Sequence, residues 1–202
     1  MANPLDTPLK IVNAAYVSLV GGEAITSFTD GTAVGKAMQQ AYETIVRECL
    51  AVNRWRFNMK KAQLVRLAEA PLESYAAAYA VPADCLVLHS VSKPALIAGG
   101  ESTEISFDWF GDEVHCNAEA TDTVIADYGW RRPESGWTPL FTEYVRYRIA
   151  TELALGPARD PQLAVMLAQQ AEIKRRYAGT MEAQARTAQQ LDVNALRSAR
   201  RR

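Results

Sequence analysis

Apolar residues recur at helical spacing near both ends of the chain and follow a shorter period in between. Thr7 and Pro8 offer an N-cap and a first-turn proline, and the spacing that follows predicts a helix over roughly 8–20, ended by Gly21-Gly22. A longer amphipathic helix is predicted after a short polar linker. Its apolar stripe consists of Val34, Met38, Ala41, Ile45, Cys49 and Val52.

Between roughly residues 55 and 128 the pattern changes to short strand-like runs, in several of which apolar and polar residues alternate. Gly111-Asp112 lies between two such runs and predicts a hairpin turn. We therefore expect an antiparallel sheet. Its predicted strands are Arg56–Lys60, Leu64–Leu67, Cys85–Val91, Ile105–Trp109, Glu113–Cys116 and Thr123–Tyr128.

The last third of the chain returns to helical spacing. A helix is predicted over roughly 139–155, because a first-turn proline begins it and Gly156-Pro157 ends it. Asp160-Pro161 begins another helix, whose apolar spacing extends towards residue 196. The segment 180–202 is rich in Ala, Gln and Arg with few large apolar residues, so we expect a partner to order it.

These elements predict an α+β fold: a helical bundle with an inserted antiparallel β-sheet and a long C-terminal helical arm. The bundle would combine residues 8–53 with 139–178, the β region would span 55–128, and the arm would span 180–202 of a single domain, 1–202. The chain has 202 residues, 49% of them hydrophobic, so we expect it to bury roughly 70% of its unfolded surface without a disulfide or metal.

Net charge, cysteine content and the N-terminal sequence limit the classes of partner and the compartment that we expect for this chain. The formal net charge is −1, which gives no global field towards nucleic acid or an anionic membrane. Three widely spaced cysteines fit a reducing compartment better than a disulfide framework. The N-terminal sequence lacks the basic start and apolar run of a signal peptide, so we expect synthesis in the cytoplasm.

The closest match to a phosphate-binding loop is Gly31–Lys36, and it departs from the motif in two ways. Its spacing is one residue short, and Ala37 stands where Ser or Thr would hold magnesium. The favoured interpretation is a helix N-terminus with an exposed lysine. A nucleotide-dependent enzyme using this loop is the less favoured alternative.

Four residues could in principle form a Cys2His2 zinc site: Cys85, His89, His115 and Cys116. Neighbouring residues of a strand point to opposite faces, so His115 and Cys116 would converge on one ion only through a bulge. Ordinary sheet positions are the favoured interpretation. No motif of a nucleophilic or metal-dependent enzyme is present, and we expect no catalytic residues, no cofactor and no metal.

The strongest local charge is the C-terminal run Arg197–Arg202. Guanidinium groups pair with both carboxylates and phosphates, so two partners are open. Carboxylates on a protein are favoured, because four arginines without interleaved aromatic residues are a small nucleic-acid footprint. The alternative is a small DNA-binding regulatory protein that uses this tail, with strongly salt-dependent affinity for duplex DNA.

A second interface candidate is the loop that leads into the helix at 139–155. It carries Arg131, Arg132 and Trp137, residue types that are enriched where proteins meet. The chain's tryptophans as a group are expected in the core or in a subunit interface, because no period places them on one surface.

The order of motifs resembles the phage head-to-tail adaptor family: tail tubular protein A of short-tailed phages, the tail accessory factors and the adaptors of gene transfer agents. The resemblance is carried by Gly21-Gly22-Glu23, by Ile25-Thr26-Ser27 with Asp30, and by a long helix ending in Arg54-Trp55-Arg56-Phe57. Further likeness lies in Tyr79–Leu86 and in Asn117-Ala118 before Tyr128, and in total about 150 residues are covered.

This resemblance implies a structural virion protein with no catalytic activity, located at the head-tail junction and assembled in the host cytoplasm. The subunit would join a homo-oligomeric ring, a dodecamer in the family, that docks on the portal protein and receives a downstream tail or nozzle protein. Double-stranded DNA would pass through the bore without specific binding. The residues assigned to portal docking are Arg186, Leu191, Leu196, Arg197, Arg200, Arg201 and Arg202.

Overall fold

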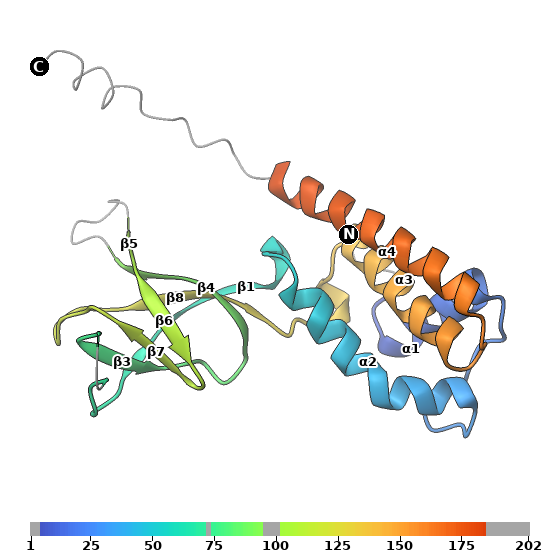
Figure 1. Cartoon of the computed structure of the whole chain (residues 1–202), viewed down its shortest axis with the longest axis horizontal. Helices are drawn as coiled ribbons and strands as arrows, with labels where there is room; N and C mark the ends of the chain where they lie inside the picture. The colour runs from blue at the N-terminus through green and yellow to red at the C-terminus, as the bar shows by residue number, and fades with distance from the viewer. Residues whose placement is uncertain (1–4, 72–73, 95–101, 185–202) are drawn as a thin grey trace, which may run out of the picture.

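The computed structural model describes residues 5–71, 74–94 and 102–184 (Figure 1). Helices and two antiparallel sheets make up the described chain, and the predicted α+β fold class is confirmed. The α-helices are α1 (Pro8–Ala15), α2 (Ala33–Ala51), α3 (Pro139–Leu155) and α4 (Pro161–Gln184). The strands are β1 (Met59–Gln63), β2 (Val65–Arg66), β3 (Ala77–Ala80), β4 (Cys85–Lys93), β5 (Thr103–Ile105), β6 (Phe107–Phe110), β7 (Glu113–Cys116) and β8 (Ile125–Trp130).

The predicted first helix has the expected extent, but its second half is a π-helix, η1 (Tyr16–Val20). The backbone amides of Gly21 and Gly22 both donate to the Tyr16 carbonyl, which widens the last turn. Gly21 has φ +84°, and a Cβ on Gly22 would lie 2.1 Å from the Tyr16 ring. Both glycines are therefore required here by backbone conformation and by close approach.

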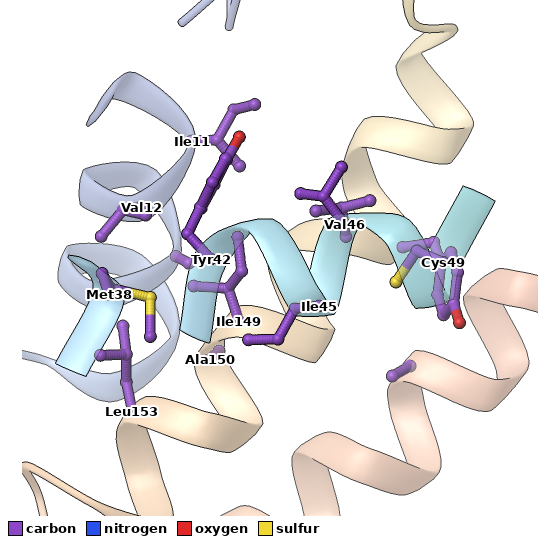
Figure 2. Packing of buried hydrophobic residues seen from close by; sticks show 14 of the residues in the cluster. Ile11, Val12, Met38, Tyr42, Ile45, Val46, Cys49, Ile149, Ala150 and Leu153 are labelled. Carbon is purple, nitrogen blue, oxygen red and sulfur yellow. The ribbon is translucent and has the colours of Figure 1, made fainter. Parts of the chain in front are cut away.

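One hydrophobic core lies between the helices (Figure 2). α2 contributes Met38, Ile45 and Val46 to it, and α3 contributes Ile149 and Leu153. α4 packs along α3, and its buried residues are Leu167 and three alanines, Ala164, Ala171 and Ala178. Other large apolar residues of α4 remain exposed.

A cluster of aromatic rings joins the end of α2 to the start of α3. Trp55 is fully buried, and its indole nitrogen donates to the Cys49 carbonyl at 2.8 Å. The ring of Phe141 lies 5.1 Å from Trp55, 4.9 Å from Phe57 and 5.1 Å from Trp137, measured between centroids. These rings fix the two chain segments that connect the helices to the β region.

Both sheets lie between α2 and α3 in chain order and at one end of the molecule in space (Figure 1). Their strand orders are β1-β8-β4-β5 and β2-β3-β7-β6, and all pairs are antiparallel. The hairpin predicted at Gly111-Asp112 joins β6 to β7, with Gly111 at φ +56°. A second, smaller core takes residues from both sheets, with Val91 and Tyr128 from the first and Tyr79 and Val114 from the second.

Three strand predictions need correction. The run Ile105–Trp109 was predicted as one strand, but the strand is interrupted after Ile105, so β5 pairs with β4 in one sheet and β6 pairs with β7 in the other. Arg56–Asn58 is a short 3-10 helix, η2, and the strand begins only at Met59, because the Asn58 amide donates to the Trp55 carbonyl and the buried Asn58 side chain turns towards the Leu50 carbonyl. Ala77–Ala80 forms strand β3, which the alternation pattern did not predict.

The first residues of the predicted C-terminal arm, 180–184, form the end of α4. This helix extends through Gln184, and Glu182 accepts a hydrogen bond from the Arg56 backbone amide at 3.2 Å. The seven residues assigned to portal docking lie in 185–202, outside the described residues. None of the helices in the described part of the chain is long and apolar enough to cross a membrane.

Candidate interaction surfaces

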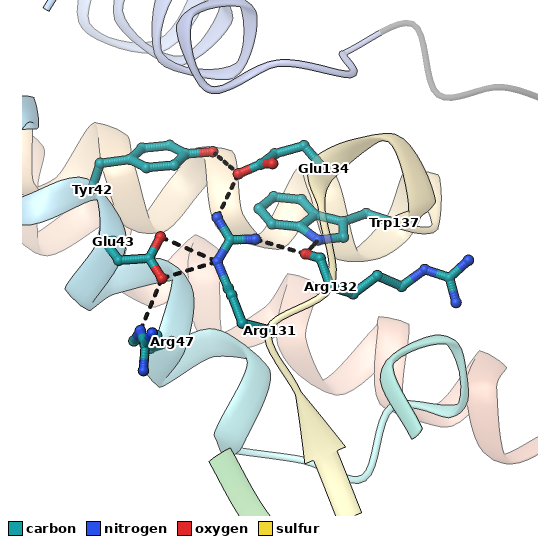
Figure 3. A network of polar contacts seen from close by, with 7 residues as sticks. All are labelled: Tyr42, Glu43, Arg47, Arg131, Arg132, Glu134 and Trp137. Carbon is teal, nitrogen blue, oxygen red and sulfur yellow. Dashed lines mark hydrogen bonds and ion pairs between the residues drawn. The ribbon is translucent and has the colours of Figure 1, made fainter. Parts of the chain in front are cut away.

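Arg131 lies at the centre of a polar network between α2 and the loop that follows β8 (Figure 3). Its guanidinium donates to both carboxylate oxygens of Glu43 at 3.1 Å and to Glu134 at 2.6 Å. The Tyr42 hydroxyl donates to the same Glu134 oxygen at 3.0 Å. Burial, followed by the Glu134 charge, raises the pKa of Tyr42 far above its ordinary value, so its hydroxyl stays a donor.

Arg132 and Trp137 complete the anchoring of the loop. The Trp137 indole nitrogen donates to the Arg132 carbonyl at 2.8 Å, and the Arg132 side chain donates to the Phe57 carbonyl. Arg131 also lies over the Trp137 ring, 5.6 Å from its centroid. The network therefore holds the connection between the β region and α3 against α2.

The three interface candidates thus contact their own chain. Trp137 is only 4% exposed and belongs to the helical core, so a partner could reach little of its side chain. Arg131 and Arg132 are partly exposed, and their contact with a partner stays a prediction. Sequence alone did not show that all three stabilise the monomer.

The phosphate-loop candidate at Gly31–Lys36 caps a helix. The Asp30 carboxylate accepts from the backbone amide of Thr32 at 2.9 Å and from that of Thr26 at 3.3 Å, and the Thr32 hydroxyl caps the Gly35 amide at 3.0 Å. These bonds hold the pKa of Asp30 below its ordinary range. Within the loop, the Thr32 amide is thus bonded to a carboxylate of the chain itself and the Gly35 amide to a hydroxyl, which favours the capping interpretation.

The residues considered for zinc lie in different sheets. Cys85 and His89 belong to β4, whereas His115 and Cys116 belong to β7. Among the residues that the structure describes, no group of three or more His, Cys, Asp or Glu side chains is placed to hold a metal ion. All three cysteines are free thiols, and burial raises the pKa of Cys49 and of Cys85 to about 11.

α4 has an apolar outer face in addition to its alanine-lined inner face. Met166, Ile173, Tyr177 and Met181 follow one another at helical spacing, and each is at least 40% exposed. Within the described residues this face packs against no other element, and it runs towards the segment beyond Gln184. We call it the α4 outer face.

An acidic, aromatic pocket of about 710 Å³ lies beside β6, the edge strand of the second sheet. The rings of Phe110 and His115 are 5.1 Å apart, and the Tyr75 hydroxyl donates to Asp108 at 2.7 Å. Glu113 contacts the His115 ring nitrogen at 3.0 Å, and Glu69 closes another side. We call this the acidic pocket; its described lining contains three carboxylates and neither lysine nor arginine.

A basic surface lies where β1 meets the C-terminal end of α4. Two adjoining hollows share Arg54, Gly179 and Ala183, and the larger has a volume of about 720 Å³. Their cationic residues are Arg54, Arg56, Lys60, Lys61, Arg175 and Arg176, and their carboxylates are Asp127 and Glu182. Arg54, Arg56, Lys60 and Lys61 come from one stretch of the sequence, and the pair Arg175-Arg176 comes from α4, so only folding brings the two groups together.

Comparison with models of known protein families finds no match to this chain, and comparison with curated proteins finds none either.

Proposed function

We propose that this chain is a subunit of a ring-shaped head-to-tail adaptor that docks on a portal protein and links it to a tail. The ring would form part of the DNA conduit, and the segment beyond α4 would dock on the portal. The observation that carries the proposal is the α4 outer face, an apolar ridge that stays exposed among the described residues and precedes that segment in the chain.

The residues that resemble the adaptor family have structural roles in the helical body. Asn13 pairs through its side chain with both backbone groups of Ile25, at 2.8 and 2.9 Å, which holds the linker after Gly21-Gly22 on α1. Trp55 and Phe57 form the aromatic junction to the β region. A rigid frame with an attached second region suits a ring subunit, which needs fixed lateral faces.

Portal docking through a helix would follow the physics of a helix in a groove. An amphipathic helix binds by placing apolar residues at successive turns into a hydrophobic groove. Met166, Ile173, Tyr177 and Met181 give α4 such a series. The segment 185–202 adds Leu191, Leu196 and the terminal arginines. A hydrophobic groove and carboxylates on the portal protein would then recognise α4 and this segment together.

The experiment measures affinity of the full chain for the cognate portal protein by biolayer interferometry. Truncation after Gln184 removes the assigned docking residues and leaves the described α4 whole, and we expect at least a tenfold loss of affinity, or about 1.4 kcal/mol. Ile173→Asp with Tyr177→Asp should weaken binding by a similar factor. Lys36→Glu, on an exposed position at the start of α2, is the matched control.

Unchanged portal affinity in both the truncated chain and the Ile173→Asp/Tyr177→Asp variant would remove the docking assignment. Unfolding midpoints near that of the unaltered chain would show that a loss of binding does not come from unfolding.

The basic surface gives a specific reason to test the DNA-binding alternative. Six cations on one face could neutralise several phosphates, and such binding falls steeply as salt rises. Fluorescence anisotropy with a labelled duplex at low salt tests it. We expect weak or undetectable affinity, whereas tight, salt-sensitive binding would favour the DNA-binding regulator.

A further inference from the structure

The acidic pocket and the basic surface lie in different parts of the same chain and share no residue. The pocket is lined by β6, β7 and described residues between β2 and β3, whereas the basic surface is lined by β1 and the C-terminal end of α4; Figure 1 shows where these elements lie. Neither lies in the helical core. A single subunit therefore presents two separate surfaces of opposite charge.

The charges of the acidic pocket are only partly satisfied within the chain. The Tyr75 hydroxyl satisfies one oxygen of Asp108, and His115 contacts Glu113, but these partners carry no fixed positive charge. Glu69 is exposed at the rim. The exposed ring of Phe110 adds a π-face beside the carboxylates, an arrangement that favours a cationic side chain.

The basic surface keeps a surplus of positive charge after its internal ion pairs are counted. Arg54 pairs with Asp127, Lys60 pairs with Asp84, and Arg175 and Arg176 share Glu172. Lys61 is exposed on β1, and the side chain of Arg176 is 74% exposed despite its ion pair. Both side chains are long and exposed enough to reach into a concave partner.

We propose that copies of this chain associate head to tail, the basic surface of one copy against the acidic pocket of the next. This rests on the proposed adaptor function, in which subunits form a ring. An association between two different surfaces is heterologous and closes into a ring when the rotation per subunit divides a full turn. A two-fold arrangement that set each surface against its own copy would bring like charges together, so that arrangement is disfavoured.

Opposite charge favours a second copy as the occupant of each surface. The pocket needs cations and the same chain supplies them on a preformed surface, since β1 is held by its ladder with β8 and α4 by α3. Aromatic residues and arginine are both enriched in protein interfaces, and Phe110, Tyr75, Arg54 and Arg176 supply them here.

The test exchanges the charges of the two surfaces and follows association of the full chain by sedimentation velocity at low salt. A basic-surface variant carries Lys61→Glu and Arg176→Glu, and a pocket variant carries Glu69→Lys and Glu113→Lys. All four positions are exposed, so folding should be retained, which circular dichroism checks. Lys36→Glu with Arg159→Glu makes the same charge change at exposed positions that line neither surface.

We expect each surface variant alone to associate about 100-fold more weakly than the unaltered chain, because like charges then face each other. An equimolar mixture of the two variants should associate again, since every contact in an alternating assembly joins opposite charges. The Lys36→Glu/Arg159→Glu control should behave like the unaltered chain. Association should also weaken as salt rises.

Several results would overturn the inference. The unaltered chain could stay monomeric at every concentration, or each surface variant alone could associate as the unaltered chain does. The equimolar mixture of the two surface variants could also stay dissociated. A basic-surface variant that loses only duplex DNA affinity would make that surface a nucleic-acid site instead. Loss of association on truncation after Gln184, with no effect of Lys61→Glu and Arg176→Glu, would make the C-terminal segment the occupant.

Failure here is distinguishable from failure of the adaptor function. If the chain docks on the portal but its self-association is insensitive to the charge exchange, the adaptor function stands and the assignment of these two surfaces falls. If the chain associates through these surfaces but does not dock on the portal, the surface assignment stands and the adaptor function falls.

Discussion

The helical bundle and the β region bury their large side chains differently. In the bundle, aromatic residues such as Trp55, Phe141 and Trp137 lie inside and contact one another. In the β region the core is smaller, and Trp109 and Phe110 point outwards on the edge strand β6. The bundle therefore buries the rings at this junction and exposes large apolar residues on the α4 outer face, whereas the β region exposes two aromatic rings on one edge strand.

This difference has consequences for stability and for function. Burial of apolar area is the main source of stability, so the bundle should unfold last and the β region should open more readily. Exposed aromatic residues on an edge strand tend to mark a surface used for contact. The acidic pocket beside β6 is where we place such a contact.

The largest expected effect comes from removing the central ring of the aromatic junction. Phe141→Ala should lower the free energy of unfolding by about 3–5 kcal/mol, since Phe141 is fully buried among Trp55, Phe57 and Trp137. Urea denaturation followed by tryptophan fluorescence measures it. Phe110→Ala is the matched control from the β region and should change stability by less than about 0.5 kcal/mol. Equal losses in both variants would erase the contrast between the regions.

A smaller loss is expected from breaking the network that connects them. Arg131→Ala leaves Glu134, which is 8% exposed, without its guanidinium partner and should cost about 2–3 kcal/mol. Arg47→Ala removes an exposed ion pair to Glu43 in the same network and should cost less than about 0.5 kcal/mol. Thermal unfolding of both variants provides the comparison. A neutral Arg131→Ala would mean that the loop is held by other contacts.

The finest comparison uses the native thiols as reporters of local opening. Cys49 lies in the helical core, Cys116 in the β core, and Cys85 is partly exposed on β4. Raised pKa values keep all three mostly protonated at neutral pH. Alkylation followed by mass spectrometry should modify Cys85 first, Cys116 next and Cys49 last. Modification of Cys49 before Cys116 would show that the bundle opens first.

Much of the helical part could be predicted from sequence because its boundaries carry local signals. Thr138 caps the Phe141 amide and Pro139 begins α3, which ends where Gly156 follows, as the prediction of 139–155 required. The β region offered weaker signals. Apolar and polar residues do not alternate in Ala77–Ala80. This segment is a strand because it pairs with β2 and β7, and its side-chain pattern does not predict that pairing.

The interaction surfaces were less predictable for a related reason. Asp108 and Glu113 lie in one hairpin, but Glu69 comes near them only when a second segment, after β2, folds beside that hairpin, and no local spacing predicts this meeting. Arg131, Arg132 and Trp137 were selected for their residue types, and residue type does not reveal whether a side chain points inwards. Core membership and surface charge both depend on tertiary packing.

Electron microscopy of the full chain mixed with its cognate portal protein tests the central claim most directly. The account predicts portal particles that carry an added ring of this protein on one face. Portal particles without added density, at protein concentrations where the chain is folded, would contradict it.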